Sequence, residues 1–171
     1  MIRLEPFTRS DFFRLINWMD SRRELVQFAG PTFSYPLTED QLTEYINNEE
    51  IFPKKIVVID SGETIGHCDI NFVNEFPRLS RIIIGNEDYR GKGLGRQLIE
   101  LMIEEIQQIK PTEKVELRVF EWNKNAISLY KKAGFVIQPE STIEFKYSNE
   151  EFWTNVYMTK QLKKTNGDRI V

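Results

Sequence analysis

One stretch of the sequence, from Leu79 to Ile109, constrains the fold more than any other, because it joins a strand, a glycine-rich loop and a long helix. The run Leu79–Ile84 ends in three isoleucines, and its apolar content predicts a strand buried on both faces. The loop YRGKGLG follows, and from about Gly93 to Ile109 apolar residues recur at helical spacing until Pro111 ends the helix. A strand that enters a helix through a short loop indicates helices packed on a sheet.

A second passage from strand to helix comes later in the chain. The alternating residues Val115, Leu117 and Val119 predict a strand over 113–120, and Asn125 can cap a helix that Gly134 closes. Further strands are expected over 2–7, 56–59, 64–72, 135–137 and 152–159. These elements predict an α/β (α+β) fold in a single domain over residues 1–161, followed by a polar C-terminal tail over 162–171.

Composition and charge exclude several functional classes. The chain has 171 residues, a net charge of −3 and a pI of about 5.4, whereas nucleic-acid binders carry a basic excess, so no nucleic-acid partner is expected. Cys68 is the only cysteine and His67 the only histidine, which argues against a disulfide, a metal site or a nucleophilic triad. No apolar run is long enough to span a membrane and the N-terminus does not resemble a signal peptide, so the expected location is cytoplasmic.

The glycine-rich loop has the chemistry of an anion site. Its three alternate glycines let a ligand approach the backbone closely. The helix that follows presents free N–H groups and the positive end of its dipole in one direction. Arg90, Lys92 and Arg96 add full positive charges, so the loop suits a pyrophosphate.

The spacing of the glycines excludes the two commonest nucleotide loops. A P-loop needs four residues between its first glycine and Gly-Lys, but five separate Gly85 from Gly91. Gly93 also stands where the magnesium-binding Ser or Thr should follow Lys92. The dinucleotide fingerprint requires GxGxxG, and here Arg96 occupies the place of its last glycine.

Two motifs, in this order, resemble those of the GNAT superfamily of N-acetyltransferases. The first is Arg90-x-x-Gly93-x-Gly95 after an apolar strand, which is similar to the acetyl-CoA pyrophosphate loop of that family. The second is the block NKNAISLYKKAGF over 123–135, which resembles the family signature Asn-x-x-Ala-x-x-Leu-Tyr-x-x-x-Gly-Phe. The resemblance implies a mixed, mostly antiparallel central sheet of about seven strands flanked by helices and splayed at the strands ending near 85 and 120. It also implies acetyl-CoA as the acyl donor and no metal.

The resemblance further implies which residues bind the cofactor. The strand before the loop would pair through its backbone with the pantetheine arm, at Ile83, Ile84 and Gly85. The loop would hold the pyrophosphate through the backbone N–H groups of Arg90, Gly91, Lys92, Gly93, Leu94 and Gly95. Asn123 would hydrogen-bond the cofactor, with Asn125 and Lys131 as weaker candidates near its distal part.

The catalytic acid is implied by the same signature, whereas the base is not. Tyr130 would donate the proton that the departing thiolate needs. Some relatives place a glutamate on the strand before the signature, and Arg118 occupies that place here. Glu116, Glu121 and Asp69 lie nearby by element, but none belongs to a motif, so the general base is left unassigned.

Aromatic residues are the candidates for the acceptor pocket, which the family builds from the loop between the first helices and from the last strands. Phe33, Tyr35 and Trp122 are predicted to bind the acceptor, with Phe120 and Trp153 as further candidates. Each of these side chains could equally belong to the hydrophobic core.

The sequence therefore predicts an acetyl-CoA-dependent N-acetyltransferase that acts on a primary amine of a small molecule or on a peptide N-terminus by direct attack on the thioester. The layout is similar to the group of ribosomal-protein N-terminal and spermidine acetyltransferases. The acidic balance suggests a cationic amine. The alternative is a catalytically weak or inactive CoA-binding sensor or interaction module, and a monomer or homodimer is expected in either case.

Overall fold

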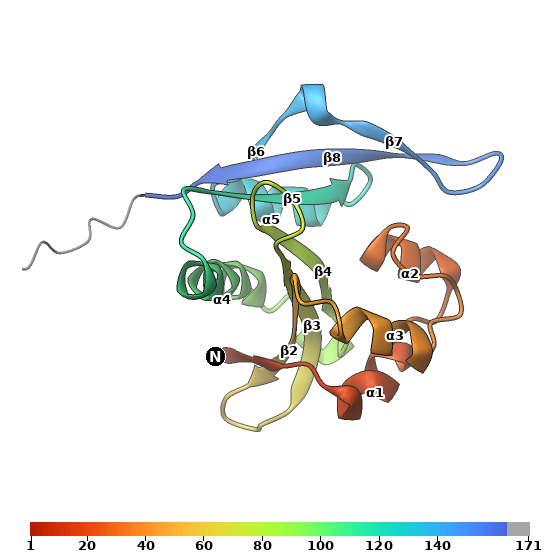
Figure 1. Cartoon of the computed structure of the whole chain (residues 1–171), viewed down its shortest axis with the longest axis vertical. Helices are drawn as coiled ribbons and strands as arrows, with labels where there is room; N and C mark the ends of the chain where they lie inside the picture. Colours follow the sequence, from red (N-terminus) through yellow and green to blue (C-terminus); the bar gives the residue numbers. More distant parts are fainter. Residues whose placement is uncertain (164–171) are drawn as a thin grey trace, which may run out of the picture.

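The computed structural model describes residues 1–163 and is built on one sheet of eight strands (Figure 1). The strands lie in the order β1-β2-β3-β4-β5-β8-β6, and β7 also pairs with β8. All neighbouring strands are antiparallel except β4 and β5. The bounds are β1 Ile2–Pro6, β2 Ile51–Val58, β3 Thr64–Asn71, β4 Arg78–Ile84, β5 Lys114–Phe120, β6 Val136–Ile137, β7 Ile143–Lys146 and β8 Phe152–Gln161.

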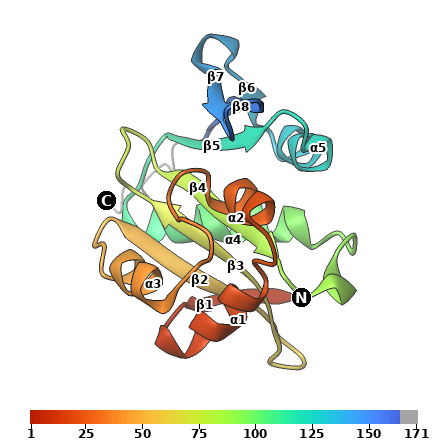
Figure 2. The same cartoon turned by 90° about the vertical axis from the view of Figure 1, so that its right-hand side faces the viewer.

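Helices cover both faces of this sheet. Figures 1 and 2 show α1, α2 and α3 on one face and α4 on the other, while α5 lies beside β5. Side-chain caps fix where two helices begin, because Ser21 Oγ accepts from the first turn of α2 and Thr38 Oγ1 from the first turn of α3. The bounds are α1 Phe12–Asn17, α2 Arg22–Ala29, α3 Glu39–Ile46, α4 Leu94–Ile109 and α5 Lys124–Lys132. In the part of the chain described, no helix is long and apolar enough to cross a membrane.

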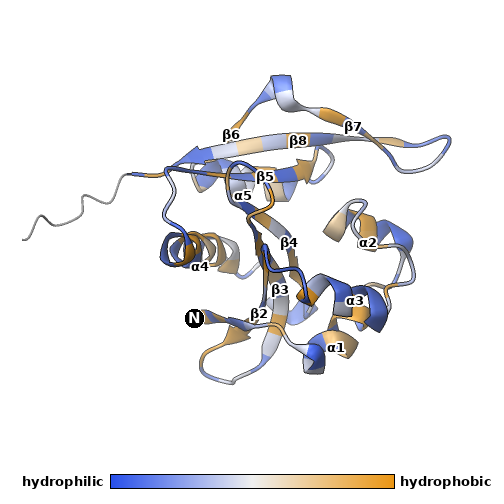
Figure 3. Cartoon of the chain, viewed as in Figure 1, coloured by the Kyte–Doolittle hydropathy of each residue, from blue (hydrophilic) through white to orange (hydrophobic). Residues whose placement is uncertain are grey.

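Two large hydrophobic cores and one small cluster of Val26, Phe120 and Trp153 attach the helices to the sheet. On one face, α4 buries Leu98, Ile99, Met102 and Ile106 against the strands. Figure 3 shows that α4 carries both hydrophobic and hydrophilic residues, as expected for a helix with one buried side. On the other face, α1–α3 bury a second set around Phe12, Leu15, Leu25 and Leu42. Burial of each such side chain contributes about 1.5–3 kcal/mol, so both helical layers are held firmly.

The pairing of β4 with β5 stops after two residues, and this opens the sheet. Arg78 pairs with Glu116 and Leu79 with Leu117, and no pair follows. The splay expected at the strands ending near 85 and 120 is therefore confirmed. Beyond Leu79, which is buried, residues 82–84 are only half-buried because the free edge of β4 borders a cleft. The prediction that this strand is buried on both faces is wrong for that reason.

Three smaller differences separate the structure from the expectation. The sheet has eight strands rather than about seven, because the short alternating segment Ile143–Lys146 forms β7. Helix α5 begins earlier than expected, since Asn123 rather than Asn125 is its cap and accepts from the N–H of Ala126. The polar tail expected over 162–171 lies, from residue 164 onward, outside the described residues. That residues 1–161 form a single domain stays a prediction.

Candidate active site

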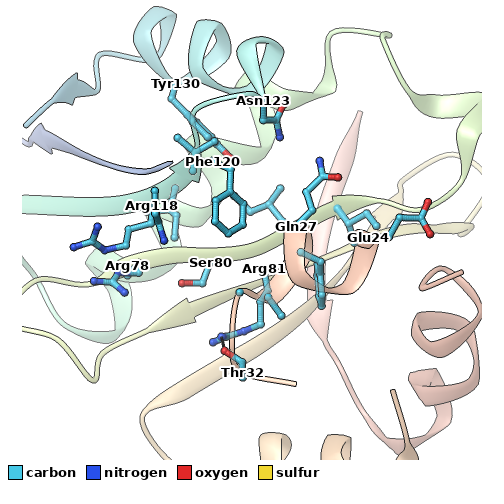
Figure 4. Close-up of a pocket in the computed structure, with 18 of the residues that line it drawn as sticks. Glu24, Gln27, Thr32, Arg78, Ser80, Arg81, Arg118, Phe120, Asn123 and Tyr130 are labelled. Atoms are coloured by element: carbon cyan, nitrogen blue, oxygen red, sulfur yellow. Dashed lines mark hydrogen bonds between the residues drawn. The ribbon is translucent and has the colours of Figure 1, made fainter. Parts of the chain in front are cut away.

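A cleft of about 770 Å³ opens where β4 and β5 separate, and α2 with the segment after it forms the opposite wall (Figure 4). Its lining is rich in polar side chains although it lies between two strands of a central sheet. The lining residues labelled in Figure 4 are Glu24, Gln27, Thr32, Arg78, Ser80, Arg81, Arg118, Phe120, Asn123 and Tyr130.

A β-bulge at Arg81 redirects β4 along the edge of this cleft. The register with β3 shifts there, so that Asp69 pairs with Ser80 whereas His67 pairs with Ile83. Arg81 has a φ of 45°, in the left-handed region that residues other than glycine rarely adopt. A bulge increases the local twist of a strand and changes which side chains face each layer, so it contributes to the divergence of β4 from β5.

A buried polar network holds this bulge. Arg81 donates from Nε and Nη2 to the two carboxylate oxygens of Asp69, and from Nη1 to Thr32 Oγ1 at 3.2 Å. Tyr45 donates to Asp69 from its hydroxyl, which also lies 3.0 Å from His67 Nε2. Burial acts to lower the pKa of Arg81, but attraction to Asp69 outweighs it and raises that pKa above its usual value. Burial also lowers the pKa of His67 to about 3, so this histidine is a neutral core residue at physiological pH.

The start of α4 has the backbone geometry of an anion site. Gly93 is the N-cap with a φ of 77°, and Gly91 has a φ of 71°. A Cβ at either position would meet no atom within 4 Å, so the left-handed conformation, not lack of space, requires glycine there. Within residues 1–163 the N–H groups of 91–93 form no hydrogen bond, and the first turn of α4 adds its own free N–H groups and no acidic side chain.

The positive side chains of the loop are partly engaged by the protein itself. Arg90 donates from Nε to the carbonyl of Ile84 at 2.9 Å and forms an ion pair with Glu87 at 2.8 Å. It therefore ties the loop to the end of β4. Arg96 pairs with a glutamate one turn further along α4, whereas Lys92 lies over the ring of a neighbouring tyrosine.

Two other glycines are required by close packing. The indole of Trp18 occupies the space where a Cβ on Gly85 would lie, and the N–H of Gly85 donates to the carbonyl of Ile65 at 2.9 Å. A Cβ on Gly95 would lie 2.5 Å from Leu129 Cδ2. Gly95 thus lets α4 approach α5, the helix that carries the second motif.

Tyr130 projects from α5 into the cleft (Figure 4). Its side chain is half-buried, and its hydroxyl forms no hydrogen bond within the described part of the chain. Burial raises the pKa of Tyr130 to about 12. The phenol is therefore neutral and holds its proton throughout the physiological range.

The cleft brings together only part of the predicted cofactor site. Ile83, Ile84, Arg90, Asn123 and Asn125 line it with Tyr130. The remaining loop residues, Gly91, Lys92, Gly93, Leu94 and Gly95, lie outside the lining at the start of α4. Gly85 and Lys131 are likewise not part of the lining.

Most of the aromatic residues considered for the acceptor lie apart from the cleft. Phe33 is buried in the core, with its ring edge-on to Tyr45. Tyr35 is exposed and donates to a backbone carbonyl at 3.3 Å. Trp122 is exposed beside Phe120, and of these residues only Phe120 lines the cleft. Their role in acceptor binding stays a prediction.

The carboxylates considered for the general base are either bound by other side chains or absent from the lining of the cleft. Both oxygens of Asp69 are bound by Arg81 and Tyr45, as described above. Glu116 is 4% exposed and is bound by Arg78 and Tyr157. Glu121 is exposed and does not line the cleft. Within residues 1–163, no three His, Cys, Asp or Glu side chains gather to hold a metal ion.

Sequence reasoning missed several polar side chains of the cleft. Asn155 on β8 pairs with Phe120 on β5, and its side-chain oxygen is buried without a hydrogen-bond partner. Arg78 and Ser80 line the cleft from β4 and Gln27 from α2. A signal for Ser80 was available, because it is a polar residue within the strand over Leu79–Ile84 that was expected to be buried on both faces.

Comparison with known sequences gives one family and several relatives. The profile of the acetyltransferase (GNAT) family matches residues 16–135. A spermidine N(1)-acetyltransferase of Escherichia coli K12 is 26% identical over 147 residues, which cover 84% of this chain and 77% of that protein. An L-amino acid N-acetyltransferase of the same strain is 30% identical over 111 residues, covering 63% and 67% of the two chains.

Solved structures share the fold. The spermidine N-acetyltransferase of Vibrio cholerae, crystallised with CoA and spermine, superimposes with a TM-score of 0.77 at 22% identity. The match covers 94% of this chain and 95% of that one, so the whole arrangement of sheet and helices is common to both.

Proposed function

The chain belongs to the GNAT acetyltransferase family and is an acetyl-CoA-dependent N-acetyltransferase, and we propose that its acceptor is a primary amine of a small molecule. This amine attacks the thioester inside the cleft between β4 and β5. The observation that carries the proposal is the position of Tyr130, which projects a protonated phenol into the splayed part of the sheet. The names of the relatives, which are spermidine and L-amino acid acetyltransferases, support a small-molecule amine.

The donor is held by two backbone features. The free N–H groups at 91–93 and in the first turn of α4 receive the pyrophosphate, which supplies the negative charge this helix start lacks. The pantetheine arm runs along the edge of β4 that β5 leaves unpaired, and adds to the sheet as an extended peptide does. Asn123 and Arg90, which line the cleft, lie along this path.

Tyr130 supplies the proton of the second half of the reaction. The amine nitrogen bonds to the thioester carbon, the C–S bond breaks, and the sulfur takes the proton from Tyr130. The surplus proton on nitrogen leaves to water, from which the phenolate is reprotonated. A free thiol has a pKa of about 8.5, whereas the pKa of Tyr130 is about 12. Proton transfer from the phenol to the thiolate is easiest when the two pKa values are similar, and burial of the sulfur in the same cleft raises the pKa of the thiol toward that of Tyr130.

Asn155 orients the acceptor. Its buried side-chain oxygen has no partner in the described part of the chain, and an N–H of the incoming amine satisfies it. The amine must be deprotonated to attack, and the two buried carboxylates considered for this step, Asp69 and Glu116, are bound by arginine and tyrosine side chains. Glu24, the carboxylate in the lining, is exposed to solvent. We assign removal of the proton to solvent, so the rate rises with pH as the acceptor loses it.

The test is acetyl transfer to a panel of polyamines, L-amino acids, aminoglycosides and N-terminal peptides, with thiol release as the rate and mass spectrometry of the product. Direct attack predicts intersecting double-reciprocal plots when both substrates are varied, whereas parallel lines would indicate an acetyl-enzyme and refute the mechanism. CoA binding without transfer to any amine would instead support the alternative of a CoA-binding module. The cytoplasmic location and the monomeric or homodimeric state stay predictions.

A further inference from the structure

The cleft is lined by an unusual excess of arginine. Arg78, Arg81, Arg90 and Arg118 border it, and the one carboxylate in the lining is Glu24. A site for a polycationic amine needs the opposite arrangement, since each additional ammonium group requires a carboxylate or several acceptor oxygens.

Three of these four arginines are neutralised by carboxylates of the protein. The pairs are Arg81 with Asp69, Arg90 with Glu87 at 2.8 Å, and Arg78 with Glu116 at 2.5 Å. The carboxylate of Glu116 is also fully used, because its second oxygen accepts from the hydroxyl of Tyr157 at 2.5 Å.

Arg118 is the remaining cation. Within residues 1–163 no carboxylate lies within ion-pair distance of it. Its Nη1 donates to the carbonyl of Ser141 at 3.1 Å, and its guanidinium group lies over the ring of Tyr157. Its Nε and Nη2 have no hydrogen-bond partner among residues 1–163. Burial and the positive charge of Arg78 lower the pKa of Arg118, and Glu116 opposes this only in part. Arginine stays charged nonetheless, so this end of the cleft carries one uncompensated positive charge.

The side chains are arranged along the cleft by charge. In Figure 4, Arg118, Arg78 and Ser80 lie together at one end of the cleft, and Tyr130 lies above that end. Glu24 and Gln27 lie toward the opposite end. We propose that the acceptor carries a carboxylate as well as its amine, and that Arg118 binds this carboxylate at the end of the cleft shared with Arg78 and Ser80. The inference rests on the amine acetylation proposed above and names the class of its acceptor, an amino acid or a similar small molecule.

The size of the charge favours a carboxylate over a phosphate. One unpaired guanidinium balances one negative charge, whereas a phosphate monoester carries about −1.5 to −2 at neutral pH. The two free donors of Arg118, Nε and Nη2, can bind both oxygens of a planar carboxylate. The expectation of a cationic amine, which followed from the net charge of the whole chain, is replaced by one drawn from the cleft itself.

The experiment compares matched acceptors in wild-type protein and in Arg118→Gln. A panel of L-amino acids is assayed beside the corresponding α-carboxamides, with spermidine included, and KM is measured at saturating acetyl-CoA. Loss of a charge-assisted bidentate contact raises KM for the acids about 10- to 100-fold. KM for the amides changes little. An acid and its amide differ in the pKa of their amine, so KM for each acceptor is compared between the two proteins rather than between the two acceptors.

Two further variants separate recognition from damage. Arg118→Lys keeps the charge but not the planar pair of donors, so it recovers part of the affinity for the acids. Arg3→Gln, which removes an exposed ion pair on β1 outside the cleft, leaves every KM unchanged. Equal use of acids and amides by the wild type, or an equal rise of both KM values in Arg118→Gln, would overturn the inference.

Failure of the proposed function has a different signature. If no amine is acetylated, binding of N-acetyl amino acids and their amides to the CoA-loaded protein is measured by calorimetry. Tighter binding of the acid, lost in Arg118→Gln, supports the carboxylate site although the transfer reaction fails. Equal binding of acid and amide overturns the carboxylate site, while rapid acetylation of spermidine alone overturns it and leaves amine acetylation intact.

Discussion

Replacement of Asp69 by asparagine tests whether the buried network at the β-bulge holds the cleft open. Asp69 is fully buried between β2 and β4, and it receives hydrogen bonds from Arg81 and Tyr45. Asp69→Asn keeps the shape of the side chain but removes its charge. Arg81, whose side chain is 8% exposed, is then left as a buried cation without a carboxylate, in a backbone conformation with a φ of 45°.

The expected cost is large because only one partner of the pair is removed. Breaking a buried ion pair from one side costs about 3–5 kcal/mol, out of a total stability of about 5–15 kcal/mol for a domain. For a domain of this size each kcal/mol shifts Tm by about 2–4 °C, so Tm should fall by roughly 6–20 °C. The affinity for acetyl-CoA should fall as well, because the bulge contributes to the separation of β4 from β5.

Urea unfolding and calorimetric melting measure the first effect, and titration of CoA at a temperature where the variant is folded measures the second. Arg3→Gln is the matched control, since its ion pair with Glu5 is exposed and should contribute little. An Asp69→Asn protein that melts like the wild type would refute the account of the network. A variant that is less stable but binds CoA normally would show that the bulge does not govern the cleft.

Three other predictions concern the helix packing, the buried histidine and the loop. Gly95→Ala should cost about 1–3 kcal/mol in urea unfolding because of the contact with Leu129, and Leu129→Ala in the same chain should remove most of that penalty. The pKa of His67 is about 3 in the folded state, below its value in the unfolded state, so the unfolded state binds more protons. The free energy of unfolding should therefore fall as pH drops below about 6.5, by about 2 kcal/mol at pH 5. His67→Gln should make the free energy of unfolding depend less on pH in this range. Gly93→Val places a β-branched residue at a φ of 77°, and CoA binding should be lost while circular dichroism stays near that of the wild type.

The sequence predicted those parts of the molecule that depend on local chemistry. The helix after the glycine-rich loop was expected from about Gly93, and Gly93 is the N-cap of α4. The apolar repeat before Pro111 predicts a helix to Ile109, which is where α4 ends. The splay of the sheet was predicted from the resemblance, because proteins that share these two motifs share a fold.

What could not be predicted depends on contacts between distant segments. Nothing near Arg81 in the sequence indicates a left-handed conformation, since Asp69 on another strand holds it there. Arg118 could be noted as a departure from the family, but its free charge becomes visible only when Arg78 is seen to take Glu116. The position of Phe33 was equally hidden, because an aromatic residue in a loop can face a core or a cleft.

Single-turnover kinetics of Tyr130→Phe decide whether Tyr130 donates a proton during transfer of the acetyl group in this cleft. The hydroxyl makes no hydrogen bond within the described chain, so its removal should leave the stability and the CoA affinity near those of the wild type. The rate of acetyl transfer should fall about 10²- to 10⁴-fold, which is the usual contribution of a general acid. The wild type should also keep its activity to pH 10, since a pKa of about 12 holds the phenol protonated. A Tyr130→Phe protein that transfers acetyl at the wild-type rate would contradict the account.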